Sequence, residues 1–249
     1  MSPNNTRLHG RRALVTGSTG GLGVAIAHRL AAEGAHVIVT GRDTDRGATV
    51  VAAIRAAGGT AEFVAADLGA GTDEVSRLVA AAGQIDILVN NAGLWAMPTP
   101  TADLTESALL QSYRTNVVAP FLLTGALAPA MAARGGGAVV NIGSITGFIG
   151  GEQSALYNST KAAVHSLTKS WAAEYGPSGV RINAVAPGPI ATERALEAAD
   201  HVAPVLARIP SRRMSTPEEV AAAVAFLASE EAGNIHGAIL SVDGGWAAT

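Results

Sequence analysis

Short apolar runs recur along the chain at regular intervals. They are rich in Val, Ile and Leu and are apolar on both faces, which is typical of strands in a parallel sheet that helices cover on each side. The predicted strands span residues 13–16, 36–40, 61–66, 86–90, 138–142, 181–186 and 238–242.

Longer stretches with helical periodicity separate these runs. The predicted helices span approximately residues 21–33, 44–57, 72–82, 104–133, 155–175 and 217–229. Alternation of strands and helices implies right-handed crossovers between parallel strands. We therefore expect an α/β fold, a doubly wound, Rossmann-like, seven-stranded parallel sheet with helices on both faces in three α/β/α layers.

No linker, repeat or low-complexity stretch divides the sequence, so we expect one domain over residues 1–249. The alternation is interrupted at residues 190–213, a mostly helical insertion between the sixth and seventh strands. An insertion beyond the carboxyl ends of parallel strands is well placed to act as a lid over a ligand crevice.

Composition narrows the possible functions. Charged residues make up 15% of the chain, against an average of about 25% in soluble proteins, which suggests that other subunits cover part of the surface. The net charge is -3 and basic runs are no longer than two residues, which argues against a nucleic-acid partner. Without cysteine the chain has no disulfide or thiolate site, and its six histidines show no clustering typical of a metal site.

The N-terminus lacks an apolar export segment, and no apolar run is expected to reach membrane-spanning length. A cytoplasmic protein without a membrane partner is the resulting expectation.

A glycine-rich stretch, TGSTGGLG, follows the first predicted strand and opens a helix. Gly17, Gly21 and Gly23 have the spacing G-x-x-x-G-x-G, which differs from the common dinucleotide fingerprint. Glycines still permit a tight turn and a close backbone approach, and the helix N-terminus offers N–H groups to a pyrophosphate. A plain strand–helix turn is the alternative interpretation, but the first such turn of a doubly wound sheet favours a dinucleotide.

Tyr157 and Lys161 are four residues apart in a predicted helix and therefore share one face. A neighbouring ammonium is expected to lower the pKa of the tyrosine phenol toward the range of a general acid/base. A surface lysine beside a half-buried tyrosine is the alternative for an isolated pair of this kind.

Three further motifs accompany these two in order along the chain: NNAG at 90–93, NIGS at 141–144 and PGPIAT at 187–192. Together the five motifs resemble the classical short-chain dehydrogenase/reductase family, and its 3-oxoacyl reductase-like members in particular, from Arg12 to Gly245. The resemblance implies a catalytic tetrad of Asn116, Ser144, Tyr157 and Lys161. Tyr157 would exchange the proton, Lys161 would support it and bind the nicotinamide ribose, Ser144 would hold the substrate oxygen, and Asn116 would hold a relay water.

The resemblance also implies how a nicotinamide dinucleotide is held. Asp67 would contact the adenine ring, Asn90 and Gly93 the adenosine half through their backbones, and Ile190 with Thr192 the nicotinamide carboxamide. The complete set of implied cofactor-binding residues is Gly17, Ser18, Thr19, Gly21, Leu22, Gly23, Arg42, Asp67, Leu68, Asn90, Ala92, Gly93, Tyr157, Lys161, Pro187, Gly188, Ile190 and Thr192.

The choice between NADP(H) and NAD(H) depends on the end of the second strand. The position that is acidic in NAD-binding relatives is Gly41 here, and Arg42 follows it, which favours NADP(H) and leaves NAD(H) possible. Asp43 complicates this prediction, because a carboxylate turned inward would repel a 2′-phosphate. A solvated Arg42 with no role in binding is the alternative.

The substrate is a small-molecule ketone or secondary alcohol in this interpretation. We expect its pocket to be largely apolar and to be lined by residues 93–100, residues 146–153 and the lid. Among the six histidines, only His201 is singled out, because it lies in the lid. Two interpretations stay open for these side chains: they line the substrate pocket, or they only pack against neighbouring residues. The side chains are the apolar Trp95, Met97, Phe148 and Ile149 and the polar Glu152 and Gln153.

Three competing functions differ from a small-molecule reductase. A 3-oxoacyl-carrier-protein reductase should carry basic docking residues, but residues 170–179 contain no arginine. A non-catalytic nicotinamide-binding regulator would not need the tetrad. A sugar-nucleotide epimerase would need a separate substrate domain after the seventh strand.

A homotetramer is expected from the resemblance and from two apolar surfaces. The predicted helix 155–175 is apolar around much of its circumference, so more than one side must be covered. The C-terminal residues 237–249 place an edge strand and Trp246 where exposure would be costly. Cover by the lid or a neighbouring helix of the same chain is the alternative.

Overall fold

The computed structural model of the protein describes residues 6–152, 154–197 and 199–248. Gln153, one of the expected polar pocket residues, therefore lies outside the described residues. Seven parallel strands form one sheet in the order β3-β2-β1-β4-β5-β6-β7. Their bounds are β1 Arg12–Val15, β2 His36–Gly41, β3 Thr60–Ala65, β4 Ile87–Asn90, β5 Gly137–Ile142, β6 Val180–Pro187 and β7 Ile239–Val242.

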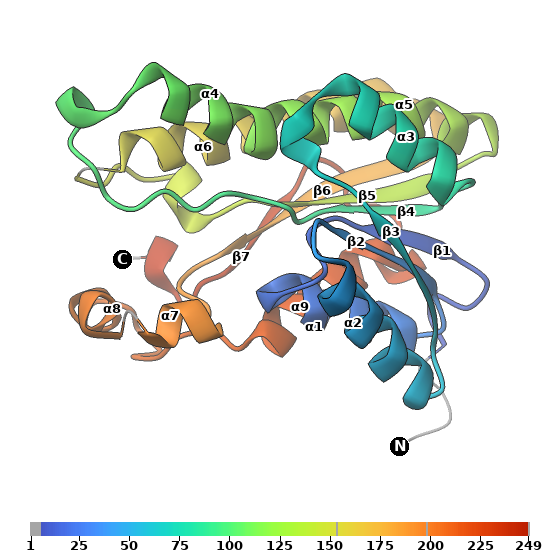
Figure 1. Cartoon of the computed structure of the whole chain (residues 1–249), viewed down its shortest axis with the longest axis horizontal. Helices are drawn as coiled ribbons and strands as arrows, with labels where there is room; N and C mark the ends of the chain where they lie inside the picture. Colours follow the sequence, from blue (N-terminus) through green and yellow to red (C-terminus); the bar gives the residue numbers. More distant parts are fainter. Residues whose placement is uncertain (1–5, 153, 198, 249) are drawn as a thin grey trace.

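Helices cover both faces of this sheet, as the sequence predicts (Figure 1). One layer contains α1, α2 and α9, and the opposite layer contains α3, α4, α5 and α6. The bounds are α1 Gly21–Ala32, α2 Thr44–Ala56, α3 Thr72–Ala82, α4 Glu106–Tyr113, α5 Ala119–Ala133, α6 Ala155–Tyr175, α7 Glu193–Glu197, α8 Ala199–Leu206 and α9 Pro217–Ala228.

Successive residues of the central strands pack into different cores, which explains why the strands are apolar on both faces. Val37 and Val39 of β2 belong to the core beneath α1, α2 and α9, whereas Ile38 belongs to the core beneath α3, α5 and α6. All three are fully buried. The period of two along a strand thus places alternate side chains in the two layers.

One predicted helix is divided in the structure. Residues 104–133 form α4 and α5, and a π-helical turn, Arg114–Val118, joins the two. Such bulges often mark functional sites, because the extra residue re-aims a side chain. Here the turn contains Asn116.

The α4–α5 stretch also corrects the prediction about apolar length. Glu106–Ala133 is 28 residues long and apolar enough to cross a membrane by length and composition, so that prediction is wrong. In this fold the stretch packs against the sheet, and Leu123, Leu127 and Met131 are buried in the core. A core helix of a globular domain satisfies the same criterion.

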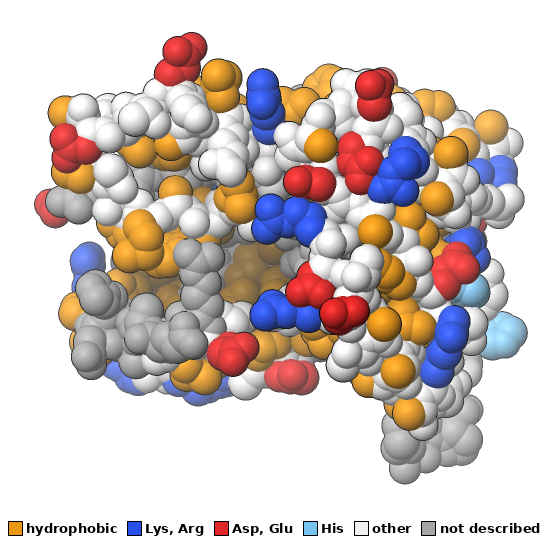
Figure 2. Space-filling model, viewed as in Figure 1, with side chains coloured by type: hydrophobic (Ala, Val, Ile, Leu, Met, Phe, Trp, Pro, Cys, Tyr) orange, Lys and Arg blue, Asp and Glu red, His pale blue; other side chains and the backbone are white. Residues whose placement is uncertain are grey.

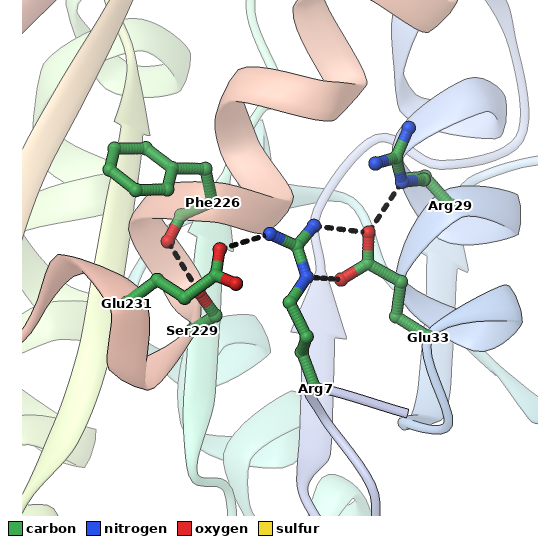
Figure 3. Close-up of polar contacts among 6 residues, drawn as sticks. All are labelled: Arg7, Arg29, Glu33, Phe226, Ser229 and Glu231. Atoms are coloured by element: carbon green, nitrogen blue, oxygen red, sulfur yellow. Dashed lines mark hydrogen bonds and ion pairs between the residues drawn. The ribbon is translucent and has the colours of Figure 1, made fainter. Parts of the chain in front are cut away.

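An ion-pair cluster joins the segment before β1 to the layer that contains α1, α2 and α9 (Figure 3). The guanidinium of Arg7 donates to both carboxylate oxygens of Glu33, at 2.9 and 2.6 Å, and Arg29 also donates to that carboxylate. Glu33 is fully buried. Glu231, in the turn after α9, accepts from Arg7 on its other side. Segments distant in sequence are therefore joined by one guanidinium.

The strand order reverses at β1, which has β2 on one side and β4 on the other. In open α/β sheets, ligands bind in the crevice beyond the carboxyl ends of the strands at such a switch point. The loops after β1, β4, β5 and β6 carry the glycine-rich stretch, the NNAG motif, Ser144 and the PGPIAT motif to this end of the sheet.

Candidate active site

The glycine-rich loop after β1 requires its glycines. Gly17 and Gly21 have φ angles of 63° and 50°, a region that favours glycine. A Cβ on Gly23 would lie 2.2 Å from the carbonyl oxygen of Gly17, and one on Gly17 would lie 2.9 Å from Cα of Ala92. The loop can therefore approach both its own backbone and a ligand closely.

The start of α1 fits a pyrophosphate. Its N-cap is Gly20, and no side chain caps it, so the first N–H groups of the helix face the crevice without a capping acceptor. Ser18, by contrast, is fully buried: its hydroxyl donates to the carbonyl of Val15 at 2.7 Å and accepts from the N–H of Thr40 at 2.9 Å. Ser18 thus ties the loop to β2, and it is not among the described residues that line the groove.

A groove of about 430 Å³ runs from this loop across the ends of β2 and β3. Half of the residues implied as cofactor-binding meet there, namely Gly17, Thr19, Leu22, Gly23, Arg42, Asp67, Leu68, Ala92 and Gly93. The sequence interpretation missed Gly69, Asn91, Leu94, Gln111 and Thr115, which also line the groove. Asn91 belongs to the NNAG motif, whereas Gln111 and Thr115 lie on the α4 side and carry no motif signal.

Asn90 and Asn91 have different positions. The Asn90 side chain is buried and donates to Asn141 Oδ1 at 2.8 Å, and Asn141 in turn donates to Thr168 of α6 at 2.9 Å. The Asn91 amide donates to the carbonyls of Thr16 and Gly17, at 2.8 and 3.1 Å. The Asn90 side chain therefore links β4, β5 and α6, and Asn91 lines the groove; the predicted backbone contact of Asn90 with the cofactor stays a prediction.

A smaller recess of about 180 Å³ continues from the groove, sharing Leu22, Asn91 and Gly93 with it. It contains the other implied site residues Ser144, Tyr157, Lys161, Pro187, Gly188 and Ile190, together with Trp95, Ile142 and Gly143. Thr192 is not among its lining residues but lies beside the glycine loop, with Cγ2 3.6 Å from where a Cβ on Gly21 would be. Three of the four tetrad side chains thus meet in one recess at the switch point.

Ser144 is held by the turn that follows it. Its hydroxyl oxygen accepts from the N–H and from the hydroxyl of Thr146, at 3.2 and 3.0 Å, and caps the 3₁₀ turn Ile145–Gly147. It also forms a hydrogen bond with the Tyr157 side chain. The two hydroxyls therefore converge on one point, as a pair that binds a single substrate oxygen must.

Lys161 lies against the face of the Tyr157 ring, with Nζ 5.6 Å from the ring centroid, and donates to the carbonyl of Ile142 at 2.8 Å. Burial raises the pKa of Tyr157 to about 12, despite the Ser144 hydrogen bond, which lowers it. Burial lowers the pKa of Lys161 to about 8. The expected lowering of the tyrosine pKa by Lys161 is therefore not found, because burial outweighs an ammonium that points at a carbonyl instead of the phenol.

Asn116 is braced by the chain on both sides. Its Oδ1 accepts from the N–H of Leu94 at 2.7 Å, and its Nδ2 donates to the Leu94 carbonyl at 2.9 Å and to Thr160 Oγ1 at 3.1 Å. The amide thus connects the π-helical turn with the loop after β4 and with α6. Both ends of this amide are bound to protein, and the predicted water-holding role of Asn116 stays a prediction.

The residues at the end of β2 lie where the adenosine ribose of a bound dinucleotide would be in this fold. Asp43 accepts a hydrogen bond from the N–H of Arg46 and pairs with its guanidinium, so it caps α2 and does not turn into the groove. A side chain at Gly41 would meet Thr19, with Cβ 2.5 Å from Oγ1. Arg42 lines the groove and is the only cation among its described lining residues.

His165, one turn after Lys161, was not singled out by the sequence. It is buried beneath the Ser144 turn, and its imidazole packs against Phe148, with ring centroids 4.5 Å apart. A Cβ on Gly143 would lie 2.3 Å from its Nε2, and one on Gly147 would lie 2.6 Å from its Cε1. Neither ring nitrogen has a hydrogen-bond partner among the described residues, and burial, with Lys161 and Lys169 nearby, lowers its pKa to about 4.

The lid forms the short helices α7 and α8. A parallel β-bridge between Ile190, before α7, and Ser215, after α8, joins the two segments that flank the lid. The side chain of His201 lies outside the described part of the chain. Within the described residues, no group of three His, Asp or Glu side chains gathers that could hold a metal ion.

Comparison with known proteins identifies a family model and relatives that match this chain. A family model described as enoyl-(acyl carrier protein) reductase matches residues 17–247. A galactitol 2-dehydrogenase from Rhizobium johnstonii is 45% identical over 165 residues, which is 64% of this chain and 64% of that protein. A 3-oxoacyl-[acyl-carrier-protein] reductase from Vibrio cholerae is 38% identical over 240 residues, which is 96% of this chain and 98% of that protein.

Solved structures agree with this assignment. A dehydrogenase structure from Beutenbergia cavernae with NADP bound at low occupancy has a TM-score of 0.92 and 41% identity, and the match covers 97% of this chain and 98% of that one. The seven-stranded parallel sheet with helices on both faces matches the fold of these structural neighbours. The chain therefore belongs to the short-chain dehydrogenase/reductase family of NAD(P)-dependent oxidoreductases that act on alcohol and carbonyl groups.

Proposed function

We propose that this protein reduces a ketone to a secondary alcohol, and catalyses the reverse oxidation, with NADP(H) as its preferred cofactor. The observation that carries the proposal is the continuity of two sites. The recess containing Ser144, Tyr157 and Lys161 shares its walls with the groove that contains Arg42. A dinucleotide in the groove would reach the recess with its nicotinamide end.

The chain's own residues supply the proton and the electrostatics, and the bound nicotinamide supplies or accepts the hydride. In reduction, Tyr157 donates its phenolic proton to the carbonyl oxygen while Ser144 donates a second hydrogen bond to that oxygen. In oxidation, Tyr157 removes the hydroxyl proton. Lys161 lies at the face of the Tyr157 ring, and its ammonium would stabilise negative charge that develops on the phenol once it turns from the carbonyl of Ile142.

The preference for NADP(H) rests on charge at the end of β2. A 2′-phosphate carries negative charge and needs a cation, which Arg42 provides from the groove wall. Asp43, the acidic neighbour that would oppose a phosphate, is engaged at the N-terminus of α2. A carboxylate that binds a ribose 2′-hydroxyl has no place at Gly41, where Thr19 occupies the space.

A homotetramer in the cytoplasm is the assembly and location that we propose. Three apolar side chains that a partner subunit could cover are exposed. Val118, directly before α5, is 42% exposed, Phe121 of α5 is 51% exposed, and Leu240 of the edge strand β7 is 38% exposed. Part of the predicted outward side of α6 is covered within the chain, since Trp171 is buried beside Phe121 at 5.7 Å between ring centroids. Light scattering at micromolar concentration should show one tetrameric species, and a monomer would contradict this proposal.

The activity is tested with purified protein and a panel of ketones and secondary alcohols, each supplied with NADPH or NADH, or with the oxidised forms. Absorbance of the reduced nicotinamide reports turnover. We expect turnover of several ketones with a lower KM for NADPH than for NADH. Cofactor binding without turnover of any panel member would favour a regulator, and turnover confined to 3-oxoacyl thioesters would favour a carrier-protein reductase.

A further inference from the structure

Large apolar side chains are exposed in two separate parts of the described chain. One group lies on α4, the π-helical turn, α5 and β7, and consists of Leu109, Leu110, Val118, Phe121 and Leu240. The other group lies on the three segments that lead away from the recess after Gly93, Ser144 and Ile190, and consists of Trp95, Met97, Phe148, Ile149 and Leu196. We call the second group the apolar rim.

The three segments that carry the apolar rim start at the recess, because Gly93, Ser144 and Ile190 line it. Trp95 lines the recess together with Ser144 and Tyr157. Met97 and Leu196 are 56% and 57% exposed, the largest values among the exposed hydrophobic side chains. Figure 2 shows the hollow at this face, with hydrophobic side chains at its rear and on its left and with Lys or Arg side chains on its right. Exposed apolar surface of this kind marks a place where an apolar group binds.

The recess has few side chains that can form hydrogen bonds. Besides Ser144 and Tyr157, which would hold the reacting oxygen, they are Asn91, Lys161 and Trp95 with its indole N–H. The Asn91 amide donates to the glycine loop, and Lys161 donates to Ile142. A substrate with several hydroxyl groups would find few further side-chain partners in the recess, and an unpaired buried hydroxyl is costly.

We propose, on the basis of the function proposed above, that the substrate is an apolar ketone or secondary alcohol. Alkyl, cycloalkyl or aryl groups flank its reacting carbon and pack against the apolar rim. Polyols and sugar acids, which carry several hydroxyl groups, are poor substrates, although a relative of this chain is named as a galactitol dehydrogenase.

A matched pair of ketones tests the proposal. Butan-2-one and erythrulose have the same open four-carbon skeleton with the carbonyl at the same carbon, and erythrulose adds three hydroxyl groups. With NADPH, we expect kcat/KM for butan-2-one to exceed that for erythrulose at least tenfold. Along the series from butan-2-one to octan-2-one, kcat/KM should rise by up to about fourfold per methylene group, equivalent to about 0.8 kcal/mol.

Variants of two rim residues test whether the apolar rim causes the chain-length dependence of kcat/KM. Met97→Ser and Leu196→Ser should each flatten the chain-length dependence, with octan-2-one losing about three- to tenfold in kcat/KM and butan-2-one changing little. Leu109→Ser, the same substitution at a 43% exposed leucine of α4, is the matched control and should preserve the dependence. NADPH binding and the melting temperature show that each variant remains folded.

The outcomes separate this inference from the proposed function. A higher kcat/KM for erythrulose, gluconate or a 3-oxoacyl thioester than for the alkyl ketones overturns the apolar substrate class and leaves the reductase activity intact. Binding of octan-2-ol but not of galactitol to the NADPH complex, without turnover of any ketone, supports the apolar class and contradicts the proposed function. Equal binding of both alcohols in that case overturns the inference as well.

Discussion

The carboxylate of Asp43 accepts a 3.0 Å hydrogen bond from the backbone N–H of Arg46 and so caps the N-terminus of α2. This contact places the negative charge of Asp43 on the helix and away from the groove. Asx residues are favoured at N-caps because their side chains satisfy an otherwise unpaired N–H group. The adjacent Arg42 then remains as the cation on the groove wall.

Arg42→Ala should weaken NADP(H) selectively. Loss of a charge-assisted hydrogen bond to the phosphate costs about 1.5–3 kcal/mol, or roughly one to two decades in the KM for NADPH. The KM for NADH should change little. Arg55→Ala, which removes an arginine at the other end of α2, is the control and should leave both values unchanged; equal losses for both cofactors in Arg42→Ala would show that Arg42 does not read the phosphate.

Tyr157→Phe should abolish turnover and retain cofactor binding. The substitution keeps the ring that packs against Lys161 and removes the phenolic proton, a contribution of about 10²–10⁴-fold to the rate in general acid/base catalysis. Steady-state kcat and a fluorescence titration with NADPH measure the two effects. Tyr175→Phe, at the other end of α6, is the matched control; a Tyr157→Phe enzyme with near-normal kcat would remove Tyr157 from the chemistry.

The two reaction directions should respond differently to pH. Because burial raises the pKa of Tyr157 to about 12, the phenol is protonated throughout the neutral range, as ketone reduction requires. Alcohol oxidation needs the ionised phenol, so its kcat should rise with pH from about 7 to 10. Reduction should decline above pH 8, where the buried Lys161 loses its proton. Identical pH profiles in both directions would contradict this assignment.

His165 should make the protein sensitive to acid. Its pKa is about 4 in the folded protein and near 6.5 in the unfolded chain, so the unfolded state binds more protons between these values. The free energy of unfolding therefore falls as the pH decreases from 6.5 to 4. In His165→Leu this contribution to the fall should disappear, and the melting temperatures at pH 7 and pH 4.5 measure it; His9→Leu, at an exposed histidine, should behave like the parent protein.

Glu33→Gln should destabilise the fold. The buried carboxylate accepts from Arg7 and Arg29, and its removal leaves Arg7 with Glu231 as its remaining counter-charge and takes the counter-charge of Glu33 from Arg29 (Figure 3). Loss of hydrogen bonds between charged groups predicts a decrease of about 1.5–3 kcal/mol in the free energy of unfolding, measured with urea. Glu230→Gln breaks the exposed pair with Arg11 and should cost less than about 1 kcal/mol. Similar losses in both variants would show that burial of Glu33 adds nothing.

The sequence alone predicts the sheet because its strands carry a local signal. Runs such as 36–40 are apolar on both faces, and the observed strand His36–Gly41 differs from the prediction by one residue. The positions of Ser144, Tyr157 and Lys161 were also predictable, because each follows or opens an element at a motif spacing that the fold brings to the switch point.

Other features depend on contacts between distant segments, and only the tertiary structure decides them. The local sequence cannot tell which of two adjacent asparagines turns inward; Asn90 does so because Asn141, which donates to Thr168, is placed to accept from it. Likewise, the sequence pairs Tyr157 with Lys161, but the burial that raises the tyrosine pKa comes from the surrounding layers. His165 gains its place beneath Ser144 only when α6 packs beside two glycines of the β5 loop. Local periodicity determines the elements of this protein, whereas burial and partner geometry, which are properties of the packed chain, determine what each polar side chain does.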